Sequence, residues 1–243
     1  IKMKNKKVIY TALFGNRGSI QEPKVVPQGW DFICFTDRKD LVSKVWDIRT
    51  VEPVHEDPVR NARMHKVLAH KFLPDYEISV WIDANLCLKK NPDELVEKYL
   101  TNHNLAVFDH KNNIDSIDCL YKEAEHIFKL QAGGRYKDDP ELIKKQIKKY
   151  RDEGYPENNG LAVTMVLLRR HNKPDALKAM EEWWKQISEN SRRDQLSFNY
   201  ATWKTKLDFM YLPGDSRNNE WFEYRAHQKR TVWERIKKVV MGK

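Results

Sequence analysis

Short apolar runs that each end at a glycine or polar residue recur along the first half of the chain. They include Val8–Phe14, Asp31–Asp37, Ile78–Ile82 and Leu105–Phe108. Such runs predict buried β-strands, and their alternation with helical segments predicts an α/β domain with a largely parallel sheet. Ligands bind beyond the carboxyl ends of the strands in such sheets. The residues that close or follow the runs are therefore expected along one edge of the sheet: Gly15, Asp37, Asp83 and His110.

Helix-forming segments separate these strands. Asp57-Pro58 and residues 91–94 carry the residues that cap and open helices. The charged stretch 118–151 and the segment 175–189 are expected to be helical, and the second of these has an apolar face. The strongly apolar residues 160–168 predict a further strand.

The composition fits one sizeable domain, which we place at residues 1–225. Apolar residues make up 40% of the 243 residues, enough for a substantial core. The three cysteines, Cys34, Cys87 and Cys119, have no paired spacing, which argues against a disulfide framework or a cysteine zinc site. No apolar run approaches the ~18 residues of a membrane span, and no secretion signal opens the sequence. A cytoplasmic protein, or the soluble part of a longer one, is expected.

The C-terminal residues 226–243 are strongly basic and are expected to form a separate amphipathic helix. From Arg225 to Lys243 there are seven Lys or Arg residues and one acid, within a chain of formal net charge +9. One helical face gathers Val232, Trp233, Ile236, Val239 and Val240. Such a helix can lie on an anionic membrane surface, which would place the protein at the inner face of the membrane. The alternatives are a solvated basic end or packing against the domain.

Asp83-Ala84-Asn85 is a candidate metal-binding turn. Alternate residues at a strand end point the same way, so the Asp83 and Asn85 oxygens can converge on a divalent cation that bridges a diphosphate. The alternative is an ordinary turn, because Asp and Asn often end strands.

Arg60, Arg63 and Lys66 recur at helical spacing with few acids between them. Salt bridges within the helix do not explain these three cations. They are suited to the phosphates of a donor, whereas the alternative is a solvated basic face.

Asp194-Gln195 precedes an apolar helical pattern. At a helix start, Asp194 has three possible roles: an N-cap, a ligand of an acceptor hydroxyl, or a general base.

These elements together resemble a family. The motifs in chain order are Tyr10–Gly15, Phe35-Thr36-Asp37, Arg60-x-Ala62-Arg63-x-x-Lys66, Trp81–Asn85, His110, Asn159-Gly160-Leu161 and Arg193–Phe198. Their order and spacing are similar to those of the glycosyltransferase-like family that includes plant mucilage and turgor-regulation proteins and bacterial polysaccharide-locus proteins. The resemblance covers roughly residues 8–200. It implies a GT-A-like plan, with a single Rossmann-type mixed sheet, flanking helices and an Asp-x-Asp metal motif.

The resemblance also implies roles for individual residues on the donor side. The nucleoside would contact Thr11, Ala12, Phe14, Gly15 and Asp37. The donor phosphates would face Arg60, Arg63 and Lys66. Mn²⁺ or Mg²⁺ would be held by Asp83 and Asn85, with His227 as a candidate third ligand. Asn85 replaces the second aspartate of the usual motif, which removes one negative charge from the site.

The resemblance also implies that Asp194 is catalytic, and that the acceptor side of the site includes His110, Asn159, Gly160 and Gln195. The predicted function is therefore metal-dependent transfer of a sugar from a nucleotide sugar to a glycan or lipid-linked acceptor, as in polysaccharide or capsule biosynthesis. A UDP-sugar is the expected donor, and nucleic acid is not an expected partner. Retention and inversion of the anomeric configuration both remain open.

Two other classes of function compete with this one. Asp83 at a strand end also suits a metal-dependent phosphohydrolase, although Asn85-Leu86 departs from the usual phosphohydrolase pattern. The net positive charge also suits a non-catalytic polyanion-binding module, whose affinity would fall steeply with salt.

Overall fold

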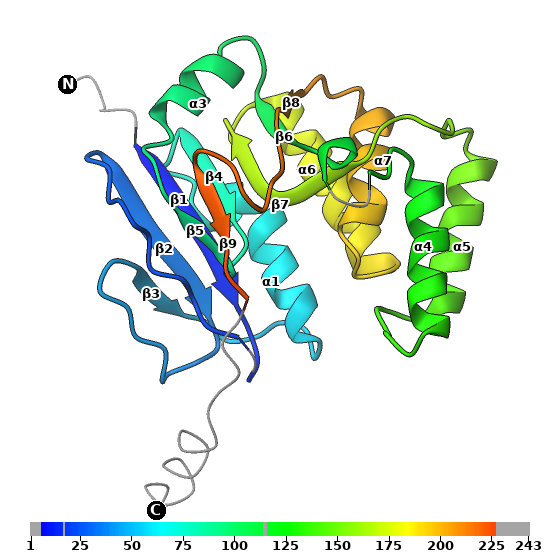
Figure 1. Cartoon of the computed structure of the whole chain (residues 1–243), viewed down its shortest axis with the longest axis horizontal. Coiled ribbons are helices and arrows are strands. Elements are labelled where there is room, and N and C mark those ends of the chain that lie inside the picture. Colours follow the sequence, from blue (N-terminus) through cyan, green and yellow to red (C-terminus); the bar gives the residue numbers. More distant parts are fainter. Residues whose placement is uncertain (1–5, 17, 114–115, 227–243) are drawn as a thin grey trace, which may run out of the picture.

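A single seven-stranded sheet forms the centre of the computed structural model, which describes residues 6–16, 18–113 and 116–226 (Figure 1). The strand order is β3-β2-β1-β4-β7-β6-β8. The strands are β1 (Lys7–Leu13), β2 (Trp30–Thr36), β3 (Asp47–Thr50), β4 (Ile78–Ile82), β6 (Leu105–Asp109), β7 (Ala162–Arg169) and β8 (Met210–Leu212). β7 runs antiparallel to both of its neighbours, and the other pairs are parallel. The predicted α/β class with one mixed sheet is confirmed.

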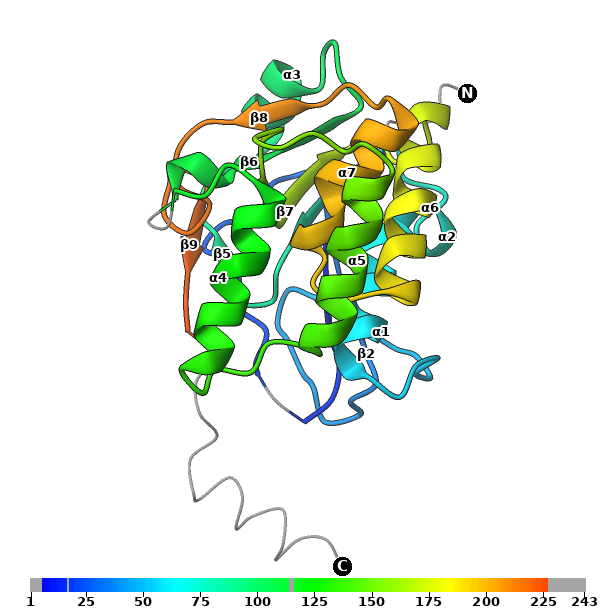
Figure 2. The same ribbon diagram turned by 90° about the vertical axis from the view of Figure 1, so that its right-hand side faces the viewer.

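Helices cover one face of the sheet, and the other face is covered more thinly. The helices are α1 (Pro58–Val67), α2 (Ala69–Phe72), α3 (Asp93–Tyr99), α4 (Leu120–Ala132), α5 (Pro140–Asp152), α6 (Pro174–Glu189) and α7 (Gln195–Thr205), with a short 3₁₀ turn, η1 (His110–Asn112). The core on one face includes residues of α1, α6 and α7. The core on the other face includes residues of α3 and of the small sheet of β5 (Leu86–Leu88) and β9 (Phe222–Tyr224). Figure 2 shows α4 and α5 as a pair beside α7.

α1 is fixed at both ends. At its start, the Asp57 carboxylate accepts from the backbone N–H of Val59 over 2.9 Å, and Pro58 occupies the first turn, as predicted. At its end, Leu68 leaves the helical conformation, with φ −91° and ψ 44°. The carbonyls there accept from the Arg169 guanidinium, which lies 2.7 Å from the Lys66 oxygen and 3.2 Å from the Val67 oxygen. A buried side chain thus satisfies carbonyls that a helix end leaves without partners, and α1 ends at Val67.

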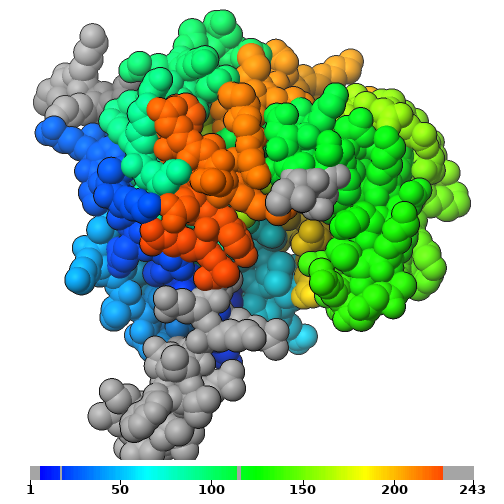
Figure 3. Space-filling view, viewed as in Figure 1, coloured from blue at the N-terminus to red at the C-terminus, as the bar shows by residue number. Residues whose placement is uncertain are grey.

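The chain after α7 returns to the edge of the sheet where Asp83 lies. β9 pairs with β5 in an antiparallel ribbon, and the backbone N–H of Arg225 donates to the Asn85 carbonyl over 2.8 Å. In the space-filling view this segment, in orange and red, lies between the blue N-terminal strands and the green α4–α5 region (Figure 3). No strand was predicted in this segment.

Two predictions fall beyond the region that the structure describes. His227 lies outside the described residues, as does all of the predicted helix 226–243 beyond its first residue. Within residues 6–16, 18–113 and 116–226, no helix is long and apolar enough to cross a bilayer.

Candidate active site

Two carboxylates and two cations meet at the carboxyl edge of the parallel strands. Asp83 follows β4, Arg63 and Lys66 project from α1, and Asp194 directly precedes α7. The Asp194 carboxylate lies 2.6 Å from Lys66 Nζ and 3.2 Å from an Arg63 guanidinium nitrogen. Asp83 Oδ1 lies farther from the same cations, at 3.6 Å from Lys66 Nζ and 3.7 Å from Arg63. We call these four residues the charge cluster.

Asp194 is buried, and both of its carboxylate oxygens contact side chains of the protein. Oδ2 accepts from Lys66 Nζ and, over 2.8 Å, from the Thr164 hydroxyl, and Oδ1 faces Arg63. Burial alone would raise the pKa of Asp194, but Arg63 and Lys66 outweigh burial and hold it well below the ordinary range. The side chain makes no capping hydrogen bond to α7. Its geometry is therefore that of a buried counter-ion. A carboxylate with so low a pKa is poorly matched to general-base work near neutral pH.

The two cations respond to the same surroundings in opposite ways. Burial lowers the pKa of Lys66, an effect that Asp194 and Asp83 oppose without cancelling. Burial also disfavours charge on Arg63, but there Asp194 and Asp83 prevail and its pKa is raised. Lys66 is 1% exposed, so its ammonium needs an anionic neighbour within the protein.

Two cavities meet at the charge cluster. The first, about 270 Å³, is lined on one side by Ala12, Phe14 and Pro58, and we call it the apolar cavity. The second, about 240 Å³, is lined by polar groups that include His110, Asn113, Arg193, Gln195 and Arg217, and we call it the polar cavity. Arg63, Asp83 and Asn85 line both cavities and stand between them.

The polar cavity carries an excess of unpaired buried atoms. Within the described part of the chain, its lining residues include five whose buried nitrogen or oxygen has no hydrogen-bond partner. They are Arg63 Nε, Asn85 Oδ1, Asn113 Nδ2, Arg193 Nε and Gln195 Nε2. Buried polar groups are nearly always hydrogen-bonded. Four of these five atoms are donor nitrogens, so the cavity is suited to a polar ligand rich in acceptor oxygens.

The predicted nucleoside loop divides into lining and supporting residues. Ala12 and Phe14 line the apolar cavity. Asp37 accepts from the Gly15 backbone N–H at 2.9 and 3.2 Å, and Gly15 has a φ of +77°, a conformation that favours glycine. Thr11 is fully buried within β1. Asp37 and Gly15 therefore shape the loop, whereas Ala12 and Phe14 reach the space that it borders.

Arg60 lies apart from the other two cations of its helix. Its guanidinium donates to the carbonyl oxygens of Ile187 and, over 2.8 Å, Asn190, at the end of α6. A cation at a helix C-terminus is favourably placed against the helix dipole. Of the three cations that helical spacing places on one face, Arg63 and Lys66 thus lie together at the charge cluster, whereas Arg60 lies at the end of α6.

The predicted acceptor-side residues also divide. His110 and Gln195 line the polar cavity, and His110 Nδ1 accepts from the Ile117 backbone N–H over 3.2 Å. Asn159 is exposed and donates to the Tyr155 hydroxyl. Gly160 has a φ of +77°, and a Cβ there would lie 2.6 Å from the Tyr211 hydroxyl. Asn159 and Gly160 are therefore not among the residues that line the polar cavity, and Gly160 allows the close packing of Tyr211.

Several lining residues were not predicted. Thr164 has one signal in the sequence, because it is the single polar residue in the apolar run 161–168. Trp81 also had a signal, since it lies on β4 two residues before Asp83, and its Nε1 donates to Asp83 Oδ1 over 2.8 Å. Asn113 and Arg217 lie in irregular segments, where no periodicity indicates the direction of a side chain.

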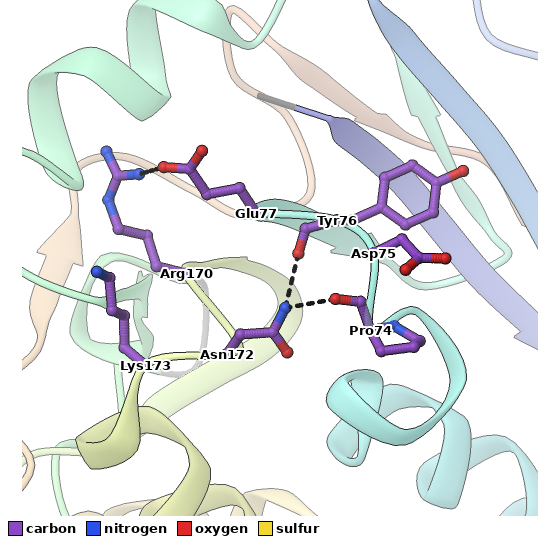
Figure 4. Close-up of a pocket in the computed structure, with 7 residues that line it drawn as sticks. All are labelled: Pro74, Asp75, Tyr76, Glu77, Arg170, Asn172 and Lys173. Carbon is purple, nitrogen blue, oxygen red and sulfur yellow. Dashed lines mark hydrogen bonds and ion pairs between the residues drawn. The ribbon is translucent and has the colours of Figure 1, made fainter. Parts of the chain in front are cut away.

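Other cavities lie at the opposite edge of the sheet. One, of about 300 Å³, is shown in Figure 4, where Asn172 donates to the Pro74 and Tyr76 carbonyls and Arg170 pairs with Glu77 at 2.9 Å. A neighbouring cavity of about 730 Å³ also includes Arg170 in its lining. No unpaired buried atom of the described residues belongs to the lining of either. These cavities therefore lack the demand for a ligand that the polar cavity shows.

The oxygens at the junction suit a hard cation. Asp83 supplies a carboxylate and Asn85 a buried amide oxygen with no donor among the described residues. Those residues contain no group of three or more His, Cys, Asp or Glu side chains placed to hold a metal. Mg²⁺ is commonly bound through one or two carboxylates, with substrate phosphates and water completing the shell. The residues present fit that kind of site.

A family model matches most of the chain. The model of the TOD1/MUCI70 glycosyltransferase-like domain matches residues 31–225, a span that contains the charge cluster and most of both cavity linings. The chain belongs to this family. The predicted family resemblance is confirmed.

The chain is also similar, at lower sequence identity, to a curated relative and to solved structures. The chain is 27% identical over 206 residues to the probable hexosyltransferase MUCI70 of Arabidopsis thaliana, covering 79% of this chain and 34% of the relative. It therefore spans about a third of that relative's length. Among solved structures, a WbbM bifunctional glycosyltransferase is similar with 12% identity and a TM-score of 0.47. The match covers 88% of this chain and 39% of the WbbM chain. Mouse xyloside xylosyltransferase 1 is similar with 11% identity and a TM-score of 0.45, and the match covers 86% of this chain and 84% of the mouse chain. TM-scores this low support no residue assignment.

Proposed function

We propose that this chain is a glycosyltransferase that moves a hexosyl or related sugar from a nucleotide sugar to a saccharide acceptor. Membership of a glycosyltransferase-like family and a relative named as a probable hexosyltransferase both support the reaction class. The observation that carries the proposal is the pair of cavities that meet at Arg63, Asp83 and Asn85. Two substrates that must react need adjacent sites with a shared wall, and this edge of the sheet has that arrangement.

The apolar cavity would take the nucleoside of the donor. Ala12, Phe14 and Pro58 offer apolar surface to a base and ribose, and a uridine nucleotide is the expected occupant. Arg63 lies at the junction, where the diphosphate would follow. An Arg guanidinium can contact two phosphate oxygens at once, so Arg63 would orient the diphosphate and stabilise it as a leaving group.

Asp83 and Asn85 would hold Mn²⁺ or Mg²⁺ beside that diphosphate. A bound divalent cation would supply positive charge to the departing nucleoside diphosphate. The chain's own contribution is to fix the two oxygens: Trp81 orients the Asp83 carboxylate, and the Arg225 backbone N–H holds the turn at Asn85.

The polar cavity would take the transferred sugar and the acceptor hydroxyl. The unpaired donors of Asn113, Arg193 and Gln195 match the acceptor oxygens that sugar hydroxyls present. Asp194 would act here as the counter-ion of Arg63 and Lys66, because its oxygens are already occupied by these cations and Thr164.

Calorimetry with UDP and a panel of UDP-sugars, with Mn²⁺ or with EDTA, tests the proposal. UDP should bind more tightly with Mn²⁺, and one UDP-sugar should be hydrolysed slowly to UDP in the absence of acceptor. If no nucleotide binds under either condition, while affinity for DNA and heparin falls steeply with salt, the polyanion-binding alternative is correct. If phosphate esters are hydrolysed in preference to sugar nucleotides, the chain is a phosphohydrolase.

A further inference from the structure

One buried ammonium is shared unequally between two carboxylates. Lys66 Nζ donates to Asp194 Oδ2 over 2.6 Å, whereas Asp83 Oδ1 lies 3.6 Å away, beyond hydrogen-bond distance. Asp194 is nearly enclosed, with a side-chain exposure of 5%, and Asp83 is more open, at 22%. The cation is thus committed to the enclosed carboxylate, and the open one faces the cavities.

Thr164 closes the Lys66–Asp194 pair into a ring. Its hydroxyl accepts from Lys66 Nζ over 3.0 Å and donates to Asp194 Oδ2 over 2.8 Å. The main chain at Lys66 is held as well, because its carbonyl accepts from the Tyr10 hydroxyl and the Arg169 guanidinium, each at 2.7 Å. Since the backbone is fixed, only the end of the Lys66 side chain is free to change partner.

We propose that Asp194 is a positioning residue that holds Lys66 and Arg63 away from Asp83, so that the Asp83 carboxylate stays available to a divalent cation. This inference rests on the metal role of Asp83 in the proposed function. A buried cation that loses its counter-ion is strongly unfavourable. Without the Asp194 charge, Lys66 cannot reach water and has Asp83 as its nearest carboxylate. An ammonium on Asp83 would then compete with the metal.

Binding of Mn²⁺ alone, followed by the electron paramagnetic resonance signal of the free ion, tests this without relying on turnover. Asp194→Asn keeps the shape of the side chain and removes its charge, and we expect Mn²⁺ affinity to fall about tenfold or more. In Asp194→Asn/Lys66→Met the competing ammonium is gone, and affinity should return to within about threefold of wild type. Thr164→Val, which keeps all four charges but opens the ring, should show a smaller loss than Asp194→Asn.

The control variant is Asp175→Asn, which removes one exposed carboxylate on α6 far from the charge cluster and should bind Mn²⁺ as wild type does. Thermal unfolding of every variant establishes that it is folded. If Asp194→Asn does not fold, the Mn²⁺ affinity of Thr164→Val is compared with that of wild type instead.

Each outcome separates the inference from the function on which it rests. If Asp194→Asn binds Mn²⁺ as tightly as wild type, the positioning role is refuted while the metal site stands. If its affinity falls and Lys66→Met does not restore it, Asp194 acts on the metal directly and the inference is wrong. If wild type binds no Mn²⁺ with or without UDP, the metal role of Asp83 fails, and the inference fails with it.

Discussion

The guanidinium of Arg169 donates to the carbonyl oxygen of Lys66 over 2.7 Å, so a fully buried cation on β7 ends the helix that carries Arg63 and Lys66. No carboxylate pairs with Arg169 within the described part of the chain. Burial lowers the pKa of Arg169 and raises that of the adjacent Tyr10 to about 12. The interaction is between a cation and the negative end of a helix.

Arg169→Ala is expected to destabilise the fold by about 3–5 kcal/mol, because it leaves a cavity and removes the donors to two buried carbonyls. Arg169→Lys restores the charge and one donor and should lose less. Urea unfolding measures both. A wild-type midpoint for Arg169→Ala would show that the end of α1 does not depend on this contact.

Gly160→Ala should be more harmful than its backbone conformation alone requires. The new Cβ would lie 2.6 Å from the Tyr211 hydroxyl, whereas Gly29, with a similar φ of +84°, has nothing within 4 Å. Gly29→Ala therefore reports backbone strain alone, of about 1 kcal/mol, and Gly160→Ala should cost about 1–3 kcal/mol more through the clash. Adding Tyr211→Phe to Gly160→Ala should recover part of that difference. Equal stabilities for the two glycine variants would contradict the packing role.

The unfolding free energy of the wild type should depend on pH in the acid range, and Asp194→Asn should abolish that part of the dependence. The pKa of Asp194 is lower in the folded state than the ~3.9 of an unfolded aspartate, so its contribution is present above that value and is lost as the pH falls below it. The difference in unfolding free energy between wild type and Asp194→Asn should therefore be constant at neutral pH and shrink from about pH 4 downward. Urea titrations between pH 7 and pH 2 measure it, and a constant difference would exclude the coupling.

Arg63→Met and Arg60→Met should separate the two arginines of α1. Arg63 lies at the cavity junction, so Arg63→Met should weaken UDP binding about tenfold or more. Arg60 donates to the carbonyls that end α6, so Arg60→Met should leave UDP affinity unchanged and lower the unfolding free energy by about 1–3 kcal/mol. Calorimetry and urea unfolding on both variants check this. A matching loss of affinity in Arg60→Met would return that residue to the phosphate site.

The basic C-terminal residues predict reversible attachment to anionic membranes. Each Lys or Arg near such a surface contributes about 1 kcal/mol, so full-length protein should float with anionic liposomes, and high salt should release it. Truncation after Lys229 should abolish flotation and leave unfolding unchanged. Failure of the full-length protein to float, or unfolding on truncation, would refute the prediction.

The parts of the fold that follow from local patterns could be predicted from the sequence. The β4 strand coincides with the apolar run 78–82, and Asp57 caps α1 as its residue type requires. The antiparallel direction of β7 could not be predicted, since strand residues carry no mark of direction. The ribbon of β5 and β9 was not predicted either, because each strand has only three residues and is stabilised by a partner that is distant in the sequence.

The residues predicted for the site include several that the structure brings together at one edge of the sheet, and there the prediction met a limit. Helical spacing placed Arg60, Arg63 and Lys66 on one face, yet it contains no information on which neighbour covers each turn of that face. Arg60 donates to a carbonyl at the end of α6, and the start of α7 places Asp194 beside Lys66. The contacts of Asp194 were equally hidden, because a position at a helix start does not determine whether the side chain turns toward the helix or into the core.

The hydrogen bond from the Arg225 N–H to the Asn85 carbonyl has a practical side. A polypeptide fused directly after residue 226, in place of the residues that follow, would depart from a point adjacent to the Asp83–Asn85 turn. One fused directly before Lys7 would depart from the amino ends of the parallel strands, at the opposite edge of the sheet. An affinity tag or fluorescent partner fused directly after residue 226 would therefore crowd the apolar and polar cavities. The same partner fused directly before Lys7 would leave both cavities clear.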